Sequence, residues 1–209
     1  MQNISGKVTS ASTGLPIEEA VITTTPSTLT VFTDNTGKFE INNINAGTYK
    51  INVYEAGHRE FQQSGIELSS GSSLSLDIKL QELSWNFIKT DNNAVAAIQY
   101  SITPKISGVP LSDGDMIGVF YDSLGASACA GYNTWKSPEN IGITIWGDDP
   151  QTKNIKEGFQ AGEVIKWKIK RKSDGKVFDA AAIYQSGQGS YITNGAMILQ
   201  GLQSAKRTF

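Results

Sequence analysis

The chain has little of the chemistry on which most enzymes and metal proteins depend. Its 209 residues include one cysteine and one histidine, so it can form no intrachain disulfide and no cluster of histidine or cysteine metal ligands. No apolar run approaches the roughly 20 residues that a membrane-spanning helix requires. The formal net charge is only −2, which gives no general attraction for nucleic acid or an anionic membrane. We therefore expect neither nucleic-acid binding nor membrane insertion.

The first residues also lack the charged and apolar segments of a secretory signal, because Met1-Gln2-Asn3 leads directly into a predicted strand. Two interpretations stay open. In the first, a signal peptide has been removed, and the mature protein works outside the cell or on its surface. Alternatively, the protein is assembled without export, as the components of a phage virion are.

What the chain does have is β-structure. Glycine, threonine, serine and asparagine are abundant, and they favour strands and turns over helices. Apolar side chains recur at every second position through Tyr49–Val53 and again through Leu74–Leu80. A period of two places one face of a strand on a core and the other in water. The sequence therefore predicts an all-β protein.

Turn residues order the strands of the first half. A strand at Ile4–Val8 is followed by the turn Gly14-Leu15-Pro16, the Asp34–Gly37 turn closes a hairpin, and Gly47-Thr48-Tyr49 starts the next strand. This order resembles the carboxypeptidase regulatory-like domain over about residues 3–81. The resemblance implies a seven-stranded prealbumin-like (transthyretin-like) Greek-key sandwich. It also implies a module that supplies rigidity, spacing or binding surface rather than catalysis.

The second half reads as another β-sandwich, so we expect two tandem domains at residues 1–82 and 83–209. Its predicted strands are Val95–Ile102, Met116–Tyr121, Ile141–Trp146, Glu163–Lys170, Val177–Tyr184 and Gly195–Leu202. The blocks at 114–121, 129–131, 146–149 and 158–163 occur in an order similar to that in β-rich modules of secreted and surface proteins from Bacteroidota. That resemblance implies fold and habitat more than activity.

A catalytic site of the Ser-His-Asp or Cys-His type would have to use His58 or Cys129, and no paired acidic site stands out. His58 takes a loop position where the resembled family often has an aromatic residue, and no partner is evident for general-base chemistry. Cys129 lies among small apolar neighbours, which favours a buried, inert thiol. We expect no catalytic residue, no organic cofactor and no enzymatic activity.

Four aspartates on two loops leave a metal site open. Asp113, Asp115, Asp148 and Asp149 offer the oxygen ligands that Ca²⁺ prefers, and two acidic loops at one end of a sandwich could converge. Their spacing matches no self-contained Ca²⁺ loop. Aspartate also caps turns by accepting backbone N–H groups, which is the competing interpretation.

Aromatic residues near turns predict a recognition surface. Tyr132, Trp135 and Trp146 could stack on sugars or anchor a protein interface, although Trp146 is also a good residue to bury beneath a loop. The basic tail that ends at Phe209 is predicted to engage a neighbour in an assembly, or else to fold back on its own domain. Three lysines, at 166, 168 and 170, alternate along one strand and are expected to face solvent.

Together these features predict a non-enzymatic structural and binding module of the adhesion type, displayed on an extracellular surface or particle. Its partners would be proteins, in a homo- or hetero-assembly such as a filament. Two alternatives are a phage structural protein, either a capsid decoration or a tail component, and a carbohydrate-binding accessory domain of a larger secreted protein.

Overall fold

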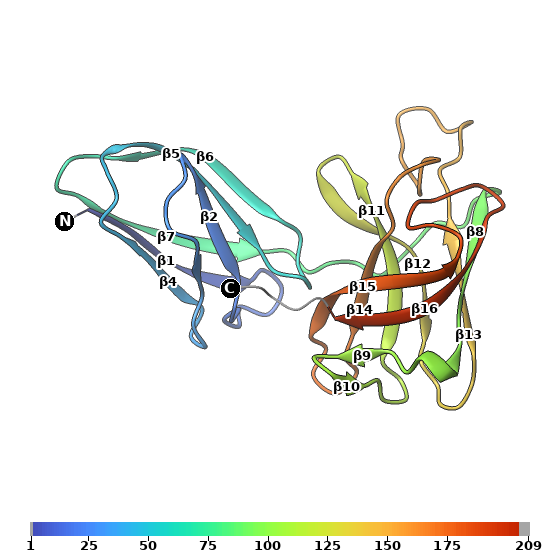
Figure 1. Cartoon of the computed structure of the whole chain (residues 1–209). Coiled ribbons are helices and arrows are strands. Elements are labelled where there is room, and N and C mark those ends of the chain that lie inside the picture. The colour runs from blue at the N-terminus through green and yellow to red at the C-terminus, as the bar shows by residue number, and fades with distance from the viewer. Residues whose placement is uncertain (1, 205–209) are drawn as a thin grey trace. The chain divides into compact units, whose positions relative to one another are not determined.

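The structure, a computed structural model, describes residues 2–204 and is built from strands (Figure 1). Contacts divide the chain into two compact units, residues 1–83 and 84–209. Within the described residues no α-helix occurs, and so no helix is long and apolar enough to cross a membrane. The all-β fold class and the two tandem sandwiches predicted from the sequence are confirmed.

Seven strands make the first domain. They are β1 (Asn3–Ser10), β2 (Val21–Thr25), β3 (Val31–Phe32), β4 (Lys38–Asn42), β5 (Gly47–Tyr54), β6 (Phe61–Leu68) and β7 (Ser73–Leu80). They form a three-stranded sheet in the order β4-β1-β7 and a four-stranded sheet in the order β3-β2-β5-β6. β1 runs antiparallel to β4 and parallel to β7. This seven-stranded sandwich is the prealbumin-like Greek key that the turn order implied.

The period of two explains the core of this domain. Tyr49, Ile51 and Val53 on β5 are buried, as are Phe39 and Ile41 on β4, while the residues between them face outward. The two sheets therefore meet through one apolar layer. The turn predicted at Asp34–Gly37 is present, but it does not close a hairpin, because β3 and β4 belong to different sheets. The Asp34 carboxylate accepts the backbone N–H groups of Thr36 and Lys38 at 2.8 and 2.9 Å.

Nine strands and one short 3-10 turn make the second domain. They are β8 (Asn93–Ile98), η1 (Tyr100–Ile102), β9 (Lys105–Ile106), β10 (Val109–Pro110), β11 (Met116–Ser123), β12 (Ala126–Thr134), β13 (Ile141–Trp146), β14 (Lys166–Lys170), β15 (Val177–Ser186) and β16 (Ala196–Ser204). One sheet runs in the order β10-β9-β16-β15-β14-β11-β12, and β8 extends it by pairing with both β16 and β13.

The two ends of this sheet meet. The Asn133 side chain on β12 donates to the Gly142 carbonyl on β13 at 2.8 Å. A Cβ atom on Gly131 would lie 2.0 Å from the Thr144 carbonyl oxygen, so only glycine permits β12 to approach β13 this closely. The sheet therefore curls around a single core, and its two halves form the layers of the sandwich.

Three strand predictions in this domain were wrong in detail. Tyr100–Ile102 forms the 3-10 turn and does not continue β8, and the strand predicted from Glu163 begins at Lys166. β12 was not predicted at all. Its sequence from Ala126 to Gly131 is rich in small residues with no apolar alternation, and its strand conformation depends on pairing with β11.

Candidate functional site

The structure places His58 beside a carboxylate and buries Cys129. His58 Nδ1 lies 2.5 Å from Glu55 Oε2, and this oxygen also accepts the Gly57 N–H at 2.8 Å. Cys129 is 3% exposed, and burial raises the pKa of its thiol to about 11. A thiol in this state is a poor nucleophile because almost no thiolate forms near neutral pH.

The four aspartates each accept at least one backbone N–H group, some from their own turn and some from a distant segment. Asp115 is buried, and its two carboxylate oxygens accept the N–H groups of Ser112 and Lys172, each at 2.9 Å. Asp113 accepts from Ser137 at 2.8 Å. Asp148 accepts from the N–H of residue 157 at 2.8 Å, and Asp149 from that of residue 151 at 2.9 Å.

The bonds from Ser112 to Asp115 and from residue 151 to Asp149 are those of turn caps, and the other bonds join separate segments. Within residues 2–204 no three histidine, cysteine or carboxylate side chains gather in a way that could hold a metal ion. A Ca²⁺ site at these loops stays a prediction, and calorimetry in EDTA and in millimolar Ca²⁺ tests it.

The three aromatics predicted to form a recognition surface lie in different places. Trp135 belongs to the core of the second domain, is 3% exposed and stacks on Tyr100, so it is not available as a platform. Tyr132 is 39% exposed and stands at the edge of an aromatic cluster. Trp146 is half-buried and lies on the outer face of β13 with Thr144. Phe209 lies outside the described residues.

The aromatic cluster around Tyr132 was missed by sequence reasoning. Trp85 contacts Phe120 edge-to-face at 5.0 Å between ring centroids and Tyr132 at 6.0 Å, and Phe87 contacts Tyr132 at 5.7 Å. Trp85 and Phe87 thus cover part of the outer face of β11 and β12. No periodicity marks the segment of residues 84–89. Only its two closely spaced aromatic residues could have indicated that it packs against a sheet.

The predicted lysine row on β14 is not fully solvated. Lys168 is 4% exposed, pairs with Asp179 at 2.7 Å and lies 5.9 Å from the centre of the Phe120 ring. Lys166 pairs with Asp122 at 2.5 Å on the exposed end of the strand. Lys166 and Lys168 are therefore both paired with carboxylates of the same domain.

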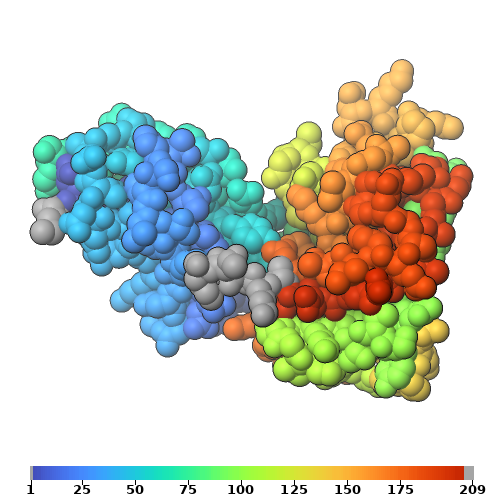
Figure 2. Space-filling view, viewed as in Figure 1, coloured from blue at the N-terminus to red at the C-terminus, as the bar shows by residue number. Residues whose placement is uncertain are grey.

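A bonded polar network fixes the long segment between β13 and β14, which projects from one end of the second domain (Figure 2). Lys156 Nζ bonds to Glu163 at 2.8 Å and to the Asp122 carbonyl at 2.6 Å. Its ammonium also lies 5.2 Å from the centre of the Tyr121 ring. Burial is the main cause that raises the pKa of Tyr121 to about 12, followed by the carboxylate of Asp148. The tyrosine is therefore neutral at physiological pH.

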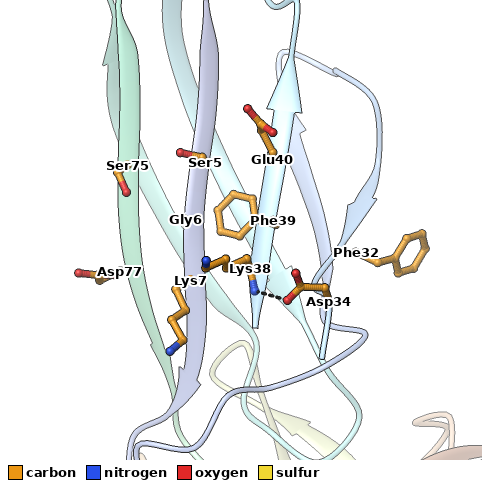
Figure 3. Close-up of a pocket in the computed structure, with 10 residues that line it drawn as sticks. All are labelled: Ser5, Gly6, Lys7, Phe32, Asp34, Lys38, Phe39, Glu40, Ser75 and Asp77. Carbon is orange, nitrogen blue, oxygen red and sulfur yellow. Dashed lines mark hydrogen bonds between the residues drawn. The ribbon is translucent and has the colours of Figure 1, made fainter. Parts of the chain in front are cut away.

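One open groove lies on the outer face of the three-stranded sheet in the first domain, with a volume of about 610 Å³. Its lining is polar apart from two phenylalanines, and Figure 3 shows it. It comprises Ser5, Gly6, Lys7, Phe32, Asp34, Lys38, Phe39, Glu40, Ser75 and Asp77. Lys7 stands opposite Lys38 on β4 and opposite Asp77 on β7. Hydroxyls and charges of both signs therefore share one shallow surface.

A second surface lies on the outer face of β8, β13 and β16. These three strands contain no charged residue. Their outward side chains pair across the strands, are small or apolar for the most part, and are half-buried or exposed. They are Asn93, Val95, Ala97, Gly142, Thr144, Trp146, Ala196 and Ile198. The solvated face of an antiparallel sheet ordinarily carries polar residues, so this uncharged face is atypical.

The comparisons with known proteins bear on the first domain. Residues 3–81 match the family model of the carboxypeptidase regulatory-like domain, which confirms the resemblance inferred from the turn order. No curated protein matches the chain.

Solved structures similar to the chain include a putative carbohydrate-binding protein from Bacteroides uniformis (14% identity, 96% of each chain, TM-score 0.36). A streptococcal ancillary pilin is 11% identical over 99% of this chain and 63% of its own, with a TM-score of 0.36. A cohesin–X-dockerin complex from Acetivibrio cellulolyticus is 20% identical over 41% of this chain and 59% of its own, with a TM-score of 0.34. Likenesses this distant carry no functional conclusion.

Proposed function

We propose that this chain is a non-enzymatic structural and binding module that docks protein partners in an assembly on a cell surface or particle. The observation that carries the proposal is the uncharged outer face of β8, β13 and β16. Val95 at its centre is 43% exposed, and Ile198 lies beside Ala97 on the neighbouring strand. Contiguous exposed apolar surface of this kind marks interaction sites in soluble proteins.

The size of this face indicates the kind of association. Three strands of about six residues cover roughly 14 by 20 Å, or about 300 Å² on each partner. Stable specific interfaces bury a total of about 1,200–2,000 Å², roughly two to three times what this face could bury with a matching partner. A single contact is therefore weak, and many copies side by side would make it effective through multivalency.

Sedimentation velocity over a range of concentrations tests the proposal. We expect weak, concentration-dependent association that Val95→Asp abolishes, because the new carboxylate would be desolvated in the contact. Val109→Asp, at a position 66% exposed elsewhere in the same domain, serves as the matched control and should change nothing. A strictly monomeric protein at high concentration would contradict self-assembly.

The setting of the assembly is a separate part of the proposal. A surface filament or adhesion complex and a phage particle would both use such a module. Negative-stain electron microscopy of the native material distinguishes them, because a filament, an isolated surface complex and a virion differ at low resolution.

A second candidate function is glycan binding in the groove of the first domain. Its hydroxyls, its carboxylates and the lysines at 7 and 38 offer donors and acceptors for sugar hydroxyls, and Phe32 at 37% exposure supplies an aromatic edge. Affinity electrophoresis in gels that contain xylan, mannan or hydroxyethyl cellulose tests it. Glycan binding in the groove would be supported if the gel retards the protein, if Lys7→Ala removes this retardation, and if Lys50→Ala on β5 leaves it unchanged.

A further inference from the structure

The free edge of β7 is a second interaction surface, in the first domain and separate from the uncharged face. β7 is the last strand of the three-stranded sheet, and within residues 2–204 it pairs along its length with β1 alone. Half of the N–H and C=O groups of such a strand point away from the sheet and can accept another strand. Eight residues make it a long edge for so small a sheet.

Burial of the inward side chains differs between the two edges of this sheet. On β4, Phe39 and Ile41 are 4% and 1% exposed, so the core is covered at that edge. On β7, Leu74 and Leu76 pack only partly against the core, although they point inward as Ile78 does. The sheet has three strands and its facing sheet has four. The exposed sides of these two leucine side chains therefore mark a position beside β7 that a further strand could fill.

The far end of β7 limits where a strand can pair. Arg59 N–H donates to the Gln81 carbonyl at 2.7 Å, and His58 forms a β-bridge with Glu82. The segment around residues 58–59 thus occupies the edge just beyond β7. The stretch that remains open runs from Ser73 to Lys79.

Side chains on the outward face of this stretch set the chemistry of a matching strand. Ser75 lies opposite Ser5, Asp77 opposite Lys7 and Lys79 opposite Thr9 on β1, and Figure 3 draws Ser75 and Asp77. Lys79 takes part in no ion pair within residues 2–204, so an incoming strand gains most from an acidic residue beside it.

A second copy of β7 cannot supply that acid. An antiparallel copy that places Asp77 beside Lys79 also places Ser75 beside Gln81, whose carbonyl is already bonded to Arg59. A two-fold pairing centred on Leu76 avoids residue 81 but sets Ser73 beside Lys79. The charges therefore favour another protein over self-pairing.

We propose that the Ser73–Lys79 edge of β7 takes up an extended segment of another protein by β-strand addition. The segment alternates apolar residues, which cover Leu74 and Leu76, with polar residues, and it carries a carboxylate beside Lys79. Main-chain hydrogen bonds supply the affinity, and contacts with Leu74, Leu76 and Lys79 set the register.

Hydrogen exchange of the full chain with a designed peptide tests this assignment. The probe is an acetylated, amidated heptapeptide in which glutamate, lysine, threonine and threonine, in that order, are separated by valines. In antiparallel pairing its glutamate meets Lys79 and its lysine meets Asp77. We expect saturable binding and exchange at alternate amides of β7 slowed by about tenfold or more, with the amides of β6 unchanged.

Two variants of β7 and one control variant test which side chains the peptide contacts. Leu76→Ser should weaken peptide binding about tenfold, whereas Leu29→Ser, at a site 76% exposed in the same domain, should not. Lys79→Glu should remove the preference for the peptide over one with glutamate and lysine exchanged.

The proposal would be overturned if the peptide did not slow amide exchange at β7, or slowed it equally at β6. Protection of β7 without peptide, accompanied by dimerisation, would instead assign the edge to a second copy.

Discussion

Gly118 and the indole of Trp85 are in direct contact, because a Cβ atom on residue 118 would lie 2.5 Å from Cζ3 of the ring. The ring lies on β11 at this position and also contacts Phe120. The small residue in the middle of the strand is therefore what allows residues 84–89 to lie against the sheet.

The first prediction follows from this contact. Gly118→Ala should lower the free energy of unfolding by about 1–3 kcal/mol, since the indole must move away from a close-packed surface. Gly142→Ala on β13 is the matched control, because a Cβ atom there meets nothing within 4 Å. Chemical denaturation of both variants measures the difference. Equal stabilities would mean that Trp85 does not pack on Gly118.

The second prediction concerns Asp115, which is buried and uses both carboxylate oxygens. Asp115→Asn replaces one acceptor with an NH₂ group that faces a backbone donor, so a buried N–H loses its partner. We expect a loss of about 1–3 kcal/mol in the free energy of unfolding. Asp149→Asn, at a partly exposed turn with one backbone contact, should cost less. The ranking is wrong if the two variants unfold at the same denaturant concentration.

The third prediction is a pH dependence. The Thr36 hydroxyl and then the Lys38 N–H hold the pKa of Asp34 below its ordinary value of 3.8. A carboxyl group whose pKa is lower in the folded state stabilises the protein above the unfolded pKa, and this stability is lost as the pH falls through the folded value. Asp34→Ala should therefore lower the melting temperature at neutral pH, and the difference should vanish below that folded pKa. Thermal unfolding of the wild-type protein and of Asp34→Ala across the acidic pH range measures this convergence.

The fourth prediction is that Cys129 is unreactive in the folded protein. Burial raises the pKa of its thiol to about 11, so iodoacetamide at mildly alkaline pH should label it only after unfolding. Mass spectrometry with and without denaturant measures the labelling. Rapid modification of the native protein would show that β12 opens frequently.

The sequence was most informative where a local rule decides the structure. Apolar alternation identified β5 and β7, and the residues around Asp34 identified a turn, because both depend on neighbours in the chain. The hairpin predicted at that turn was wrong, because the pairing of β3 and β4 depends on distant strands. The sequence was least informative where distant segments meet. β12 owes its conformation to pairing with β11. Trp135 is buried partly by Tyr100, which precedes it by 35 residues in the chain. Aromatic residues near turns look alike in a sequence whether they are covered or exposed.

The last prediction concerns His58, which takes a loop position where the resembled family often has an aromatic residue. Its ring contacts the Glu55 carboxylate, and both side chains are only 15% exposed. The same loop holds the chain after β7, because the Leu83 N–H donates to the Gly57 carbonyl at 2.8 Å.

His58→Phe removes the ring nitrogen and leaves the Glu55 carboxylate with fewer partners in a half-buried site. We therefore expect the variant to fold but to lose about 1–3 kcal/mol of stability. The double variant with Glu55→Gln should recover part of this loss, because a neutral amide is easier to bury than an unpaired carboxylate. Thermal unfolding of the two single variants and the double variant measures the coupling between the residues. If the losses simply add, the contact contributes nothing, and the junction after β7 is held by its backbone bonds alone.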